Sequence, residues 1–491
     1  MRRLALSLPK GLAAALALLL PACSAPADQP VSASSALPSA ISAPSPNFVV
    51  ILADDLGYDD VGCYWTPDPR PGFEKINTPN LDRLASEGVR FTDFYAAAHV
   101  CTPTRAALLT GSHPVRIGMS SFEPGGAGLV LGPADDSGLN PGEITIPDLL
   151  KGRGYATACI GKWHLGHREP FQPRRHGFDV FFGGLFANDY GPDFKILRGG
   201  TVVEEAPVDQ TTLTRRFTEE SIRFLRENRD RPFFLYLAHT APHIPLHADP
   251  RFAGKSARGV YGDLVEEVDG SAGEVLKTIA ELGLDRKTLV FFTSDNGPDT
   301  RGPYAKRGQA LPLRGTKATT REGGMRVPAI ARWPGRIPAG TVTREVASVM
   351  DLLPTLAGLA GAEAPKDRIL DGRDILPLLT TPGAKSPHEA FFYYSREKLE
   401  AVRSGRWKLA FARSNLDDIP YERKKKGVPP EEILPEALYD LEADIAESVN
   451  VIDKHPDVAA RLRALAEKAR EDLGDSAAGR KGRNVRPRGR L

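Results

Sequence analysis

From residue 47 onward the chain alternates short apolar runs with stretches of helical periodicity. Continuous apolar runs of strand length, which are typical of strands buried on both faces, lie at 48–53, 155–160, 232–238 and 288–293. Between the last two runs, apolar residues recur every three or four positions from Leu264 to Leu282, which predicts a core-facing helix. This alternation predicts an α/β fold: a large mixed, mainly parallel sheet sandwiched by helices.

The pattern changes after Pro382. Short runs at 390–394, 401–403 and 407–411 predict antiparallel strands, and 456–473 predicts a helix with one apolar side. We therefore expect a main domain over 47–382 and a smaller C-terminal α+β domain over 383–475. Residues 476–491 are expected to form a disordered basic tail, because the stretch from Arg480 to Leu491 holds six basic side chains and no acidic one.

The first 46 residues are interpreted as an export signal and a linker. A basic start, the apolar run 11–20 and then Leu20-Pro21-Ala22-Cys23 predict a secretory signal peptide over 1–23. The same four residues resemble a bacterial lipobox, which makes Cys23 a candidate lipid anchor; plain cleavage after Ala25 or Ala27 is the alternative. Residues 24–46 are rich in Ser, Ala and Pro, the composition of a linker. We expect an exported protein, periplasmic or on the outer surface.

Composition narrows the function classes. A chain of 491 residues, 41% of them hydrophobic, is long enough for two or more domains with a sizeable core. Its 64 Lys and Arg against 62 Asp and Glu argue against a nucleic-acid partner, which requires a strong basic excess. Four Cys are too few for a disulfide-stapled fold. Cys63 and Cys159 belong to no motif. They could form a disulfide with each other or remain two buried free thiols, and the sequence does not decide between these alternatives.

Polar side chains follow four of the predicted strands. They are Asp54-Asp55 after the first, Lys162 and His164 after the second, His239 and His243 after the third, and Asp295-Asn296 after the fourth. Each acidic pair alone is also typical of a turn. Because ligands bind at the carboxyl ends of strands in open α/β sheets, the coincidence of all four predicts a single site.

Oxygen ligands dominate this predicted site. The side chains of Asp54, Asp55, Asp295 and Asn296 suit a hard cation such as Ca²⁺ or Mg²⁺ rather than a thiolate zinc site. A zinc-protease motif such as HExxH is absent from the sequence. A cation there would polarise an oxyanion.

A cysteine precedes a predicted helix. In Cys101-Thr102-Pro103-Thr104-Arg105, Pro103 suits the first turn of a helix that Gly111 ends, so Cys101 is expected just before the helix N-terminus. That position favours anions and activates nucleophiles. A buried inert thiol is the alternative, and the spacing from Cys101 to Arg105 is too short for a cysteine-phosphatase loop.

Residues 101–105 match the C-x-P-x-R signature of the type I sulfatases, in which the cysteine is oxidised to formylglycine. Segments that resemble the sulfatases in the same order lie at 47–58, 77–91, 161–166, 241–246, 294–297, 312–328 and 438–450. The resemblance covers nearly all of 47–473. It implies an alkaline-phosphatase-like main domain followed by a small four-stranded sheet with a packed helix.

The resemblance also implies roles for individual residues. The implied ligands of one calcium ion, favoured over magnesium, are Asp54, Asp55, Asp295, Asn296 and the modified Cys101. Arg105 would hold the formylglycine hydrate, and Lys162 and Lys317 would bind sulfate oxygens. His243 would protonate the leaving oxygen, and His164 would assist release of sulfate. Asn188 and Asp189 lie where some sulfatases contact substrate, although a turn is the alternative there.

The implied activity is hydrolysis of a sulfate monoester through the formylglycine hydrate and a covalent sulfo-enzyme intermediate. A sulfated carbohydrate is the expected substrate, and an enzyme that generates formylglycine is the expected partner; the sequence leaves the oligomeric state open. The alternatives are a phosphomonoester or phosphonate hydrolase of the same superfold and a non-catalytic binding lipoprotein. One departure from the family is a long loop at 63–73, expected either to bring Trp65 or Phe73 to the substrate or to pack structurally.

Overall fold

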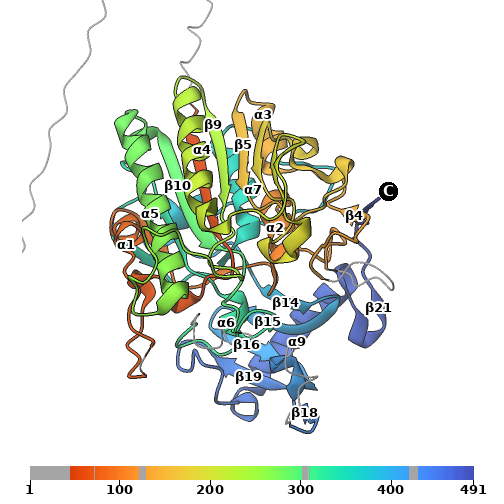
Figure 1. Cartoon of the computed structure of the whole chain (residues 1–491). Helices are drawn as coiled ribbons and strands as arrows, with labels where there is room; N and C mark the ends of the chain where they lie inside the picture. Colours follow the sequence, from red (N-terminus) through yellow and green to blue (C-terminus); the bar gives the residue numbers. More distant parts are fainter. Residues whose placement is uncertain (1–44, 71, 121–128, 301–307, 309, 420–428) are drawn as a thin grey trace, which may run out of the picture. The chain divides into compact units, whose positions relative to one another are not determined.

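The protein is represented by a computed structural model that describes residues 45–70, 72–120, 129–300, 308, 310–419 and 429–491. A ten-stranded sheet dominates it (Figure 1). In spatial order the strands are β12 (Thr341–Thr343), β2 (Val89–Phe91), β11 (Ala329–Arg332), β10 (Thr288–Ser294), β1 (Asn47–Ala53), β9 (Phe233–Ala238), β5 (Ala156–Gly161), β6 (Val180–Gly183), β7 (Ile196–Arg198) and β8 (Thr201–Glu204). The four strands expected from apolar runs, β1, β5, β9 and β10, lie side by side at its centre and are parallel.

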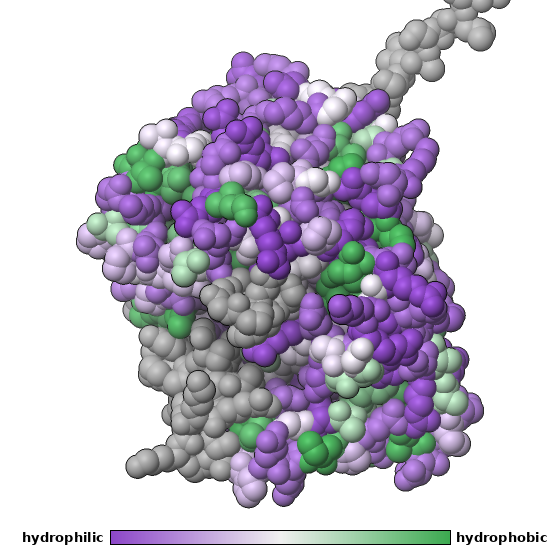
Figure 2. Space-filling view, turned by 90° about the vertical axis from the view of Figure 1, so that its right-hand side faces the viewer, coloured by the Kyte–Doolittle hydropathy of each residue, from purple (hydrophilic) through white to green (hydrophobic). Residues whose placement is uncertain are grey.

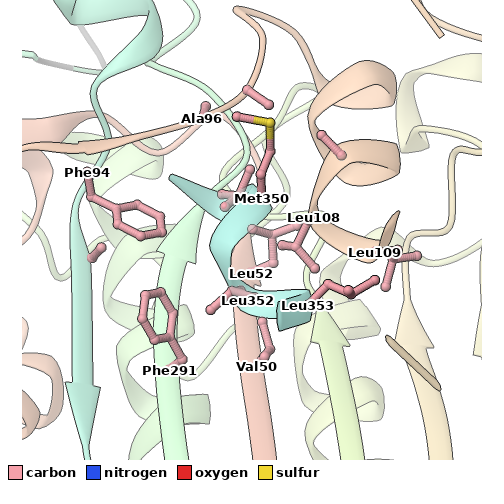
Figure 3. Close-up of a cluster of buried hydrophobic side chains, with 14 of the residues drawn as sticks. Val50, Leu52, Phe94, Ala96, Leu108, Leu109, Phe291, Met350, Leu352 and Leu353 are labelled. Carbon is pink, nitrogen blue, oxygen red and sulfur yellow. The ribbon is translucent and has the colours of Figure 1, made fainter. Parts of the chain in front are cut away.

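Helices cover both faces of the sheet because successive residues of β1 point in opposite directions. Phe48, Val50 and Leu52 pack with α2 (Cys101–Thr110), α3 (Ile146–Lys151) and α7 (Leu352–Leu359); Figure 3 shows part of this layer. The intervening residues of β1 pack with α1 (Pro79–Ser86), α4 (Leu213–Glu227) and α5 (Gly259–Glu281). The sandwich expected from the sequence is confirmed.

The C-terminal part contains a four-stranded antiparallel sheet, as expected. Its order is β14 (Phe391–Ser395), β15 (Lys398–Ser404), β16 (Trp407–Ala410) and β19 (Ala437–Asp440). Helix α9 (Pro456–Asp472) covers one face through Leu462, Leu465 and Ala469. The remaining short elements are β3 (Phe94–Tyr95), β4 (Ser137–Gly138), α6 (Glu322–Met325), β13 (Ala347–Ser348), α8 (Leu376–Thr380), β17 (Arg413–Ser414), β18 (Ile433–Leu434), β20 (Gly474–Asp475), β21 (Arg480–Lys481) and β22 (Gly489–Arg490).

The prediction of a disordered tail over 476–491 is wrong. Strand β21 pairs with β20, and β22 pairs with β4 of the main domain. Basic side chains of the tail form ion pairs with carboxylates elsewhere in the chain: Arg486 lies 2.7 Å from Glu143, and Arg483 lies 2.7 Å from Glu471. The described residues from 45 onward therefore belong to one compact unit that includes the tail.

Several sequence expectations concern residues outside this description. The predicted signal peptide, 1–23, and all but the last two residues of the predicted linker, 24–46, lie outside the described residues.

Within the described ranges, no helix has the length and apolar character needed to cross a bilayer. The face in Figure 2 is mostly hydrophilic, with hydrophobic residues in small scattered groups. Cys63 and Cys159 are both free thiols, so the alternative of a disulfide between them is wrong.

Candidate active site

The acidic residues meet at the carboxyl ends of β1 and β10. The parallel register sets Ala53 opposite Ser294, so the residues that follow each strand become neighbours. The backbone N–H of Asp55, which has a positive φ of 64°, donates to Asp295 Oδ1 at 3.2 Å. Asn296 Nδ2 donates to Asp55 Oδ1 at 2.7 Å. The structure thus brings all four predicted oxygen ligands to one edge of the sheet.

Cys101 lies at the same point. It is the first residue of α2 rather than the residue before the helix, and its Sγ lies 3.4 Å from Asp54 Oδ1. Burial raises the pKa of the Cys101 thiol well above its usual range, even though Lys162 and Lys317 favour the thiolate. An unmodified Cys101 is therefore protonated and a weak nucleophile.

Arg105, one helical turn after Cys101, connects the acids to the β5 loop. Its guanidinium lies 2.8 Å from Asp295 Oδ2 and 3.6 Å from Asp54 Oδ2, and its Nη1 donates to the carbonyl of Lys162 at 3.0 Å. All of these side chains are inaccessible to solvent. A guanidinium paired with two carboxylates keeps its charge and fixes their orientation.

Two lysines neutralise the two consecutive aspartates. Lys162 Nζ lies 2.5 Å from Asp54 Oδ2, and Lys317 Nζ lies 2.7 Å from Asp55 Oδ2. Burial raises the pKa of Asp54, but Lys162, His243 and Arg105 outweigh it and hold that pKa well below its usual range. Burial, opposed by Lys317, raises the pKa of Asp55 to about 6. Burial together with the charge of Asp54 raises the pKa of Asp295 to about 7.

His243 and His164 are both neutral in this environment. His243 Nδ1 donates to the carbonyl of Ile244 at 2.6 Å, leaving Nε2 3.6 Å from Asp55 Oδ2. Burial, assisted by Lys317, lowers the pKa of His243 to about 3. His164 Nε2 donates to the carbonyl of Leu131 at 2.9 Å, and burial lowers its pKa well below the usual range. Since a carbonyl only accepts, Nδ1 of His164 carries a lone pair, and it has no partner among the described residues.

Comparison with known proteins identifies this arrangement. A family model described as "Sulfatase" matches residues 46–362, and one described as "C-terminal region of aryl-sulfatase" matches 386–487. Arylsulfatase A of Homo sapiens is 41% identical over 442 residues, which cover 83% of each chain. The chain belongs to the sulfatase family. Steryl-sulfatase of Mus musculus is 40% identical over 454 residues, which cover 76% of this chain and 71% of the relative.

A solved structure has the same fold. It is that of Ps i-CgsB in complex with k-i-k-neocarrahexaose, with a TM-score of 0.71 and 29% identity, over 86% of this chain and 92% of that one. The mixed sheet and the C-terminal antiparallel sheet described above are those of the family. The sulfatase therefore hydrolyses sulfuric esters.

The acidic edge of the sulfatase fits a divalent cation. Ligand atoms of Asp54, Asp55, Cys101 and His243 all lie within 4.8 Å of one another. The Oδ1 of Asn296 is buried and, within the described part of the chain, accepts no hydrogen bond. An orphaned amide oxygen beside carboxylates whose pKa burial has raised is a donor set for Ca²⁺ or Mg²⁺.

The sulfatase places the two weaker substrate candidates differently. Asn188 is buried, its Nδ2 donates to Gln210 Oε1 at 3.0 Å, and both residues line a small niche beside His243. Asp189 is exposed, and both residues begin a 3₁₀ segment, so a turn is also present. Gln210 was missed by sequence reasoning because no motif surrounds it.

Other residues of the sulfatase turn out to be structural. The ring of His239 shares a hydrogen bond of 3.1 Å with Ser271 Oγ of α5. Phe73 is nearly buried, with the guanidinium carbons of Arg70 and Arg258 4.1 and 5.4 Å from its ring centre. The packing alternative therefore holds for Phe73. Thr102, which sequence reasoning passed over, donates to the carbonyl of His164 at 2.9 Å and so supports that histidine.

Proposed function

We propose that this sulfatase desulfates carbohydrates through a formylglycine made from Cys101, with a calcium ion held by Asp54, Asp55, Asp295 and Asn296. The observation that carries the proposal is the buried Cys101 Sγ, 3.4 Å from Asp54 among fixed positive groups. Burial keeps the thiol protonated, so the residue suits the reaction only after chemical conversion.

The hydrated aldehyde would supply two hydroxyl groups on one carbon, one to attack sulfur and one whose proton is lost when sulfate leaves. Arg105 would hold this group, and its position one turn along the same helix supports that role. The cation, when bound, would stabilise negative charge on the attacking and sulfate oxygens.

Lys162 and Lys317 would bind the sulfate group. Both ammonium groups are buried, so they offset the charge of the anion without competition from solvent. A bound sulfate would also offset the positive charge of the two lysines, which, in addition to burial, helps to hold the pKa of His243 at about 3. The pKa of His243 would then rise toward the range in which it can donate a proton to the leaving oxygen. His164, with its free Nδ1 lone pair, is suited to accept the proton from the remaining hydroxyl.

A carbohydrate is proposed as the alcohol part. Support comes from the neocarrahexaose in the complex that shares this fold at 29% identity. A steryl-sulfatase is 40% identical to this chain, more than the 29% of that complex, so sequence identity alone does not decide the substrate. The test is a desulfation screen over defined sulfated saccharides and a sulfated steroid, with Cys101→Ala as the blank.

The formylglycine is tested separately. We expect the peptide that contains residue 101 to have lost sulfur and gained oxygen when the protein is made together with a formylglycine-generating enzyme, the proposed maturation partner. Turnover of an aryl sulfate far above that of the matching aryl phosphate is expected. A faster aryl phosphate would instead support the phosphomonoester hydrolase alternative, and an unmodified, inactive protein would support the binding lipoprotein.

Export is also proposed, on the basis of the signal sequence at residues 1–23. A lipid on Cys23 predicts that the protein sediments with membranes and that Cys23→Ser releases it. An intact first residue on protein from the native host would contradict export.

A further inference from the structure

A cavity of about 660 Å³ lies at the same edge of the main sheet as the active site. Strand β2 runs in the direction of β10, because the β11 strand between them is antiparallel to both, and β12 is parallel to β2. Residues that follow these two strands, Thr92–Asp93 and Arg344–Val346, line the cavity. The carboxyl ends of strands are where open α/β sheets bind ligands.

The cavity is separate from the sulfate position but close to it. Strands β10 and β11 lie between β1 and β2. Three strand spacings place the ends of β1 and β2 about 14 Å apart. Tyr58, three residues after Asp55, also lines the cavity. A ligand long enough to span this distance would reach both places.

Positive charge exceeds negative charge in the cavity lining. Among the described residues the lining holds five Arg and Lys against three Asp and Glu. Arg326 and Arg403 share Asp93, at 2.8 and 2.5 Å. At the rim, Arg344 is exposed and has no hydrogen bond or ion pair within the described ranges.

Apolar and aromatic side chains also contribute to the cavity lining. Val346 and Leu441 line the cavity and are buried, and Tyr64 lines it with 5% of its surface exposed. Arg406, from the turn between β15 and β16, lies at the rim and pairs with the exposed Glu442 at 2.9 Å. Apolar side chains together with the guanidinium of Arg344, unpaired among the described residues, match a sugar ring, whose C–H face is apolar and whose edge carries an anionic substituent.

We propose that this cavity, here named the β2–β12 cavity, binds a second sulfated sugar of the substrate chain, away from the ester that is cleaved. The proposal rests on the proposed function, since it extends a carbohydrate substrate beyond the catalytic site. It assigns Arg344 to the second sugar alone, outside the groups that contact the cleaved ester.

Binding is tested without turnover, in full-length Cys101→Ala protein. The probes are dextran sulfate oligosaccharides of two and eight sugars, unsulfated dextran of equal length, and polyglutamate, titrated calorimetrically at low ionic strength. The test variant is Arg344→Glu. The matched control is Arg229→Glu, because Arg229 is also exposed but precedes β9, at the opposite edge of the sheet.

For the octasaccharide, Arg344→Glu is expected to weaken binding about three- to tenfold, while Arg229→Glu leaves it unchanged. The sulfated disaccharide should bind more weakly than the octasaccharide to the unsubstituted Cys101→Ala protein, because it can occupy only one of the two positions. Equal affinities of the two variants, or equally tight binding of unsulfated dextran, would overturn the proposal. Loss of polyglutamate binding equal to that of the octasaccharide would overturn it in favour of an acidic peptide.

A second measurement separates this proposal from the proposed function. With Cys101 present, Arg344→Glu should hydrolyse a small aryl sulfate at the wild-type rate, which also shows that the variant is folded. A loss of that activity would contradict a role limited to the β2–β12 cavity. Failure of the wild-type protein to hydrolyse any sulfate ester would refute the proposed mechanism but would leave the binding result interpretable.

Discussion

Gly297, directly after the proposed metal ligand Asn296, offers a sharp test of how the site is held together. Its N–H donates to the carbonyl of Gly324 at 3.0 Å. A Cβ added to Gly297 would lie 1.8 Å from the carbonyl oxygen of Gly323, a distance that real Cβ atoms do not adopt. In Gly297→Ala the two backbones must therefore separate.

The size of the displacement follows from the contact. Moving from 1.8 Å to the 3.0 Å at which such contacts begin requires a shift of about 1.2 Å. The backbone of Gly323 is itself packed closely against that of Gly315, two residues before Lys317: a Cβ on Gly323 would lie 2.2 Å from the carbonyl oxygen of Gly315. A displacement of Gly323 is therefore expected to move the segment that carries Lys317. A misplacement of about 1 Å is enough to lower catalysis about a hundredfold.

The assay is kcat/KM for a small aryl sulfate, with thermal unfolding and near-UV circular dichroism to verify the fold. The matched control is Gly358→Ala in α7, where an added Cβ meets no atom within 4 Å. That control should keep full activity and gain about 0.5–1 kcal/mol in stability. A folded Gly297→Ala enzyme with wild-type kcat/KM would refute the argument from close approach.

Three further predictions concern buried charges. Lys408→Met should lower the free energy of unfolding in urea by about 3–5 kcal/mol, because Lys408 Nζ lies 2.9 Å from the buried Glu322; the partly exposed Lys398→Met should cost below about 1 kcal/mol, and equal losses would contradict this. Burial raises the pKa of Glu267 to about 7, so the folded state keeps a proton that the unfolded state loses. Stability should therefore fall as the pH rises from 4.5 through 7, by up to about 3 kcal/mol, and Glu267→Gln should remove that fall in unfolding curves measured at pH 5 and 8. Chelation should lower activity and the unfolding temperature, and Ca²⁺ should restore both in the wild type but less completely in Asn296→Ala; an unchanged unfolding temperature would argue against a bound cation.

The central strands could be predicted because burial on both faces leaves a continuous apolar run. Strands β1, β5, β9 and β10 begin and end within one residue of the expected limits. The six strands outside this central group, β2, β6, β7, β8, β11 and β12, were not predicted. In β8, Val202 and Val203 are both exposed, so apolar residues do not mark a buried face. A strand of four residues is also too short to show a clear alternation of apolar and polar positions.

The acids of the site could be predicted for the same reason. Asp54, Asp55 and Asp295 follow buried strands, so their meeting point depends only on parallel register. Lys317 could be inferred only through the resemblance to sulfatases. Its position depends on long-range contacts, such as the hydrogen bond from its N–H to the carbonyl of Pro298 at 3.0 Å, which carry no local pattern.

The prediction of disorder in the C-terminal tail is wrong because the partners of the tail lie far away in the sequence. Six basic residues without an acid indicate disorder only if no partner lies elsewhere in the chain. Here Arg488 Nε donates to the carbonyl of Gly118 at 3.0 Å, and Arg486 pairs with Glu143. Each of these partners is more than 300 residues away in the sequence, so a local sequence pattern cannot predict the contact.

The division into a main and a C-terminal domain describes the order of elements rather than independent parts. Lys408 of β16 donates to the carbonyl of Thr320, three residues after Lys317, at 3.0 Å. Ser395 of β14 hydrogen-bonds His99, two residues before Cys101, at 3.2 Å. The C-terminal sheet thus contacts both the segment that carries Lys317 and the segment that carries Cys101. Lys408 also pairs with the buried Glu322 at 2.9 Å, and removing one partner of such a pair is costly. The two parts are therefore expected to fold as one unit.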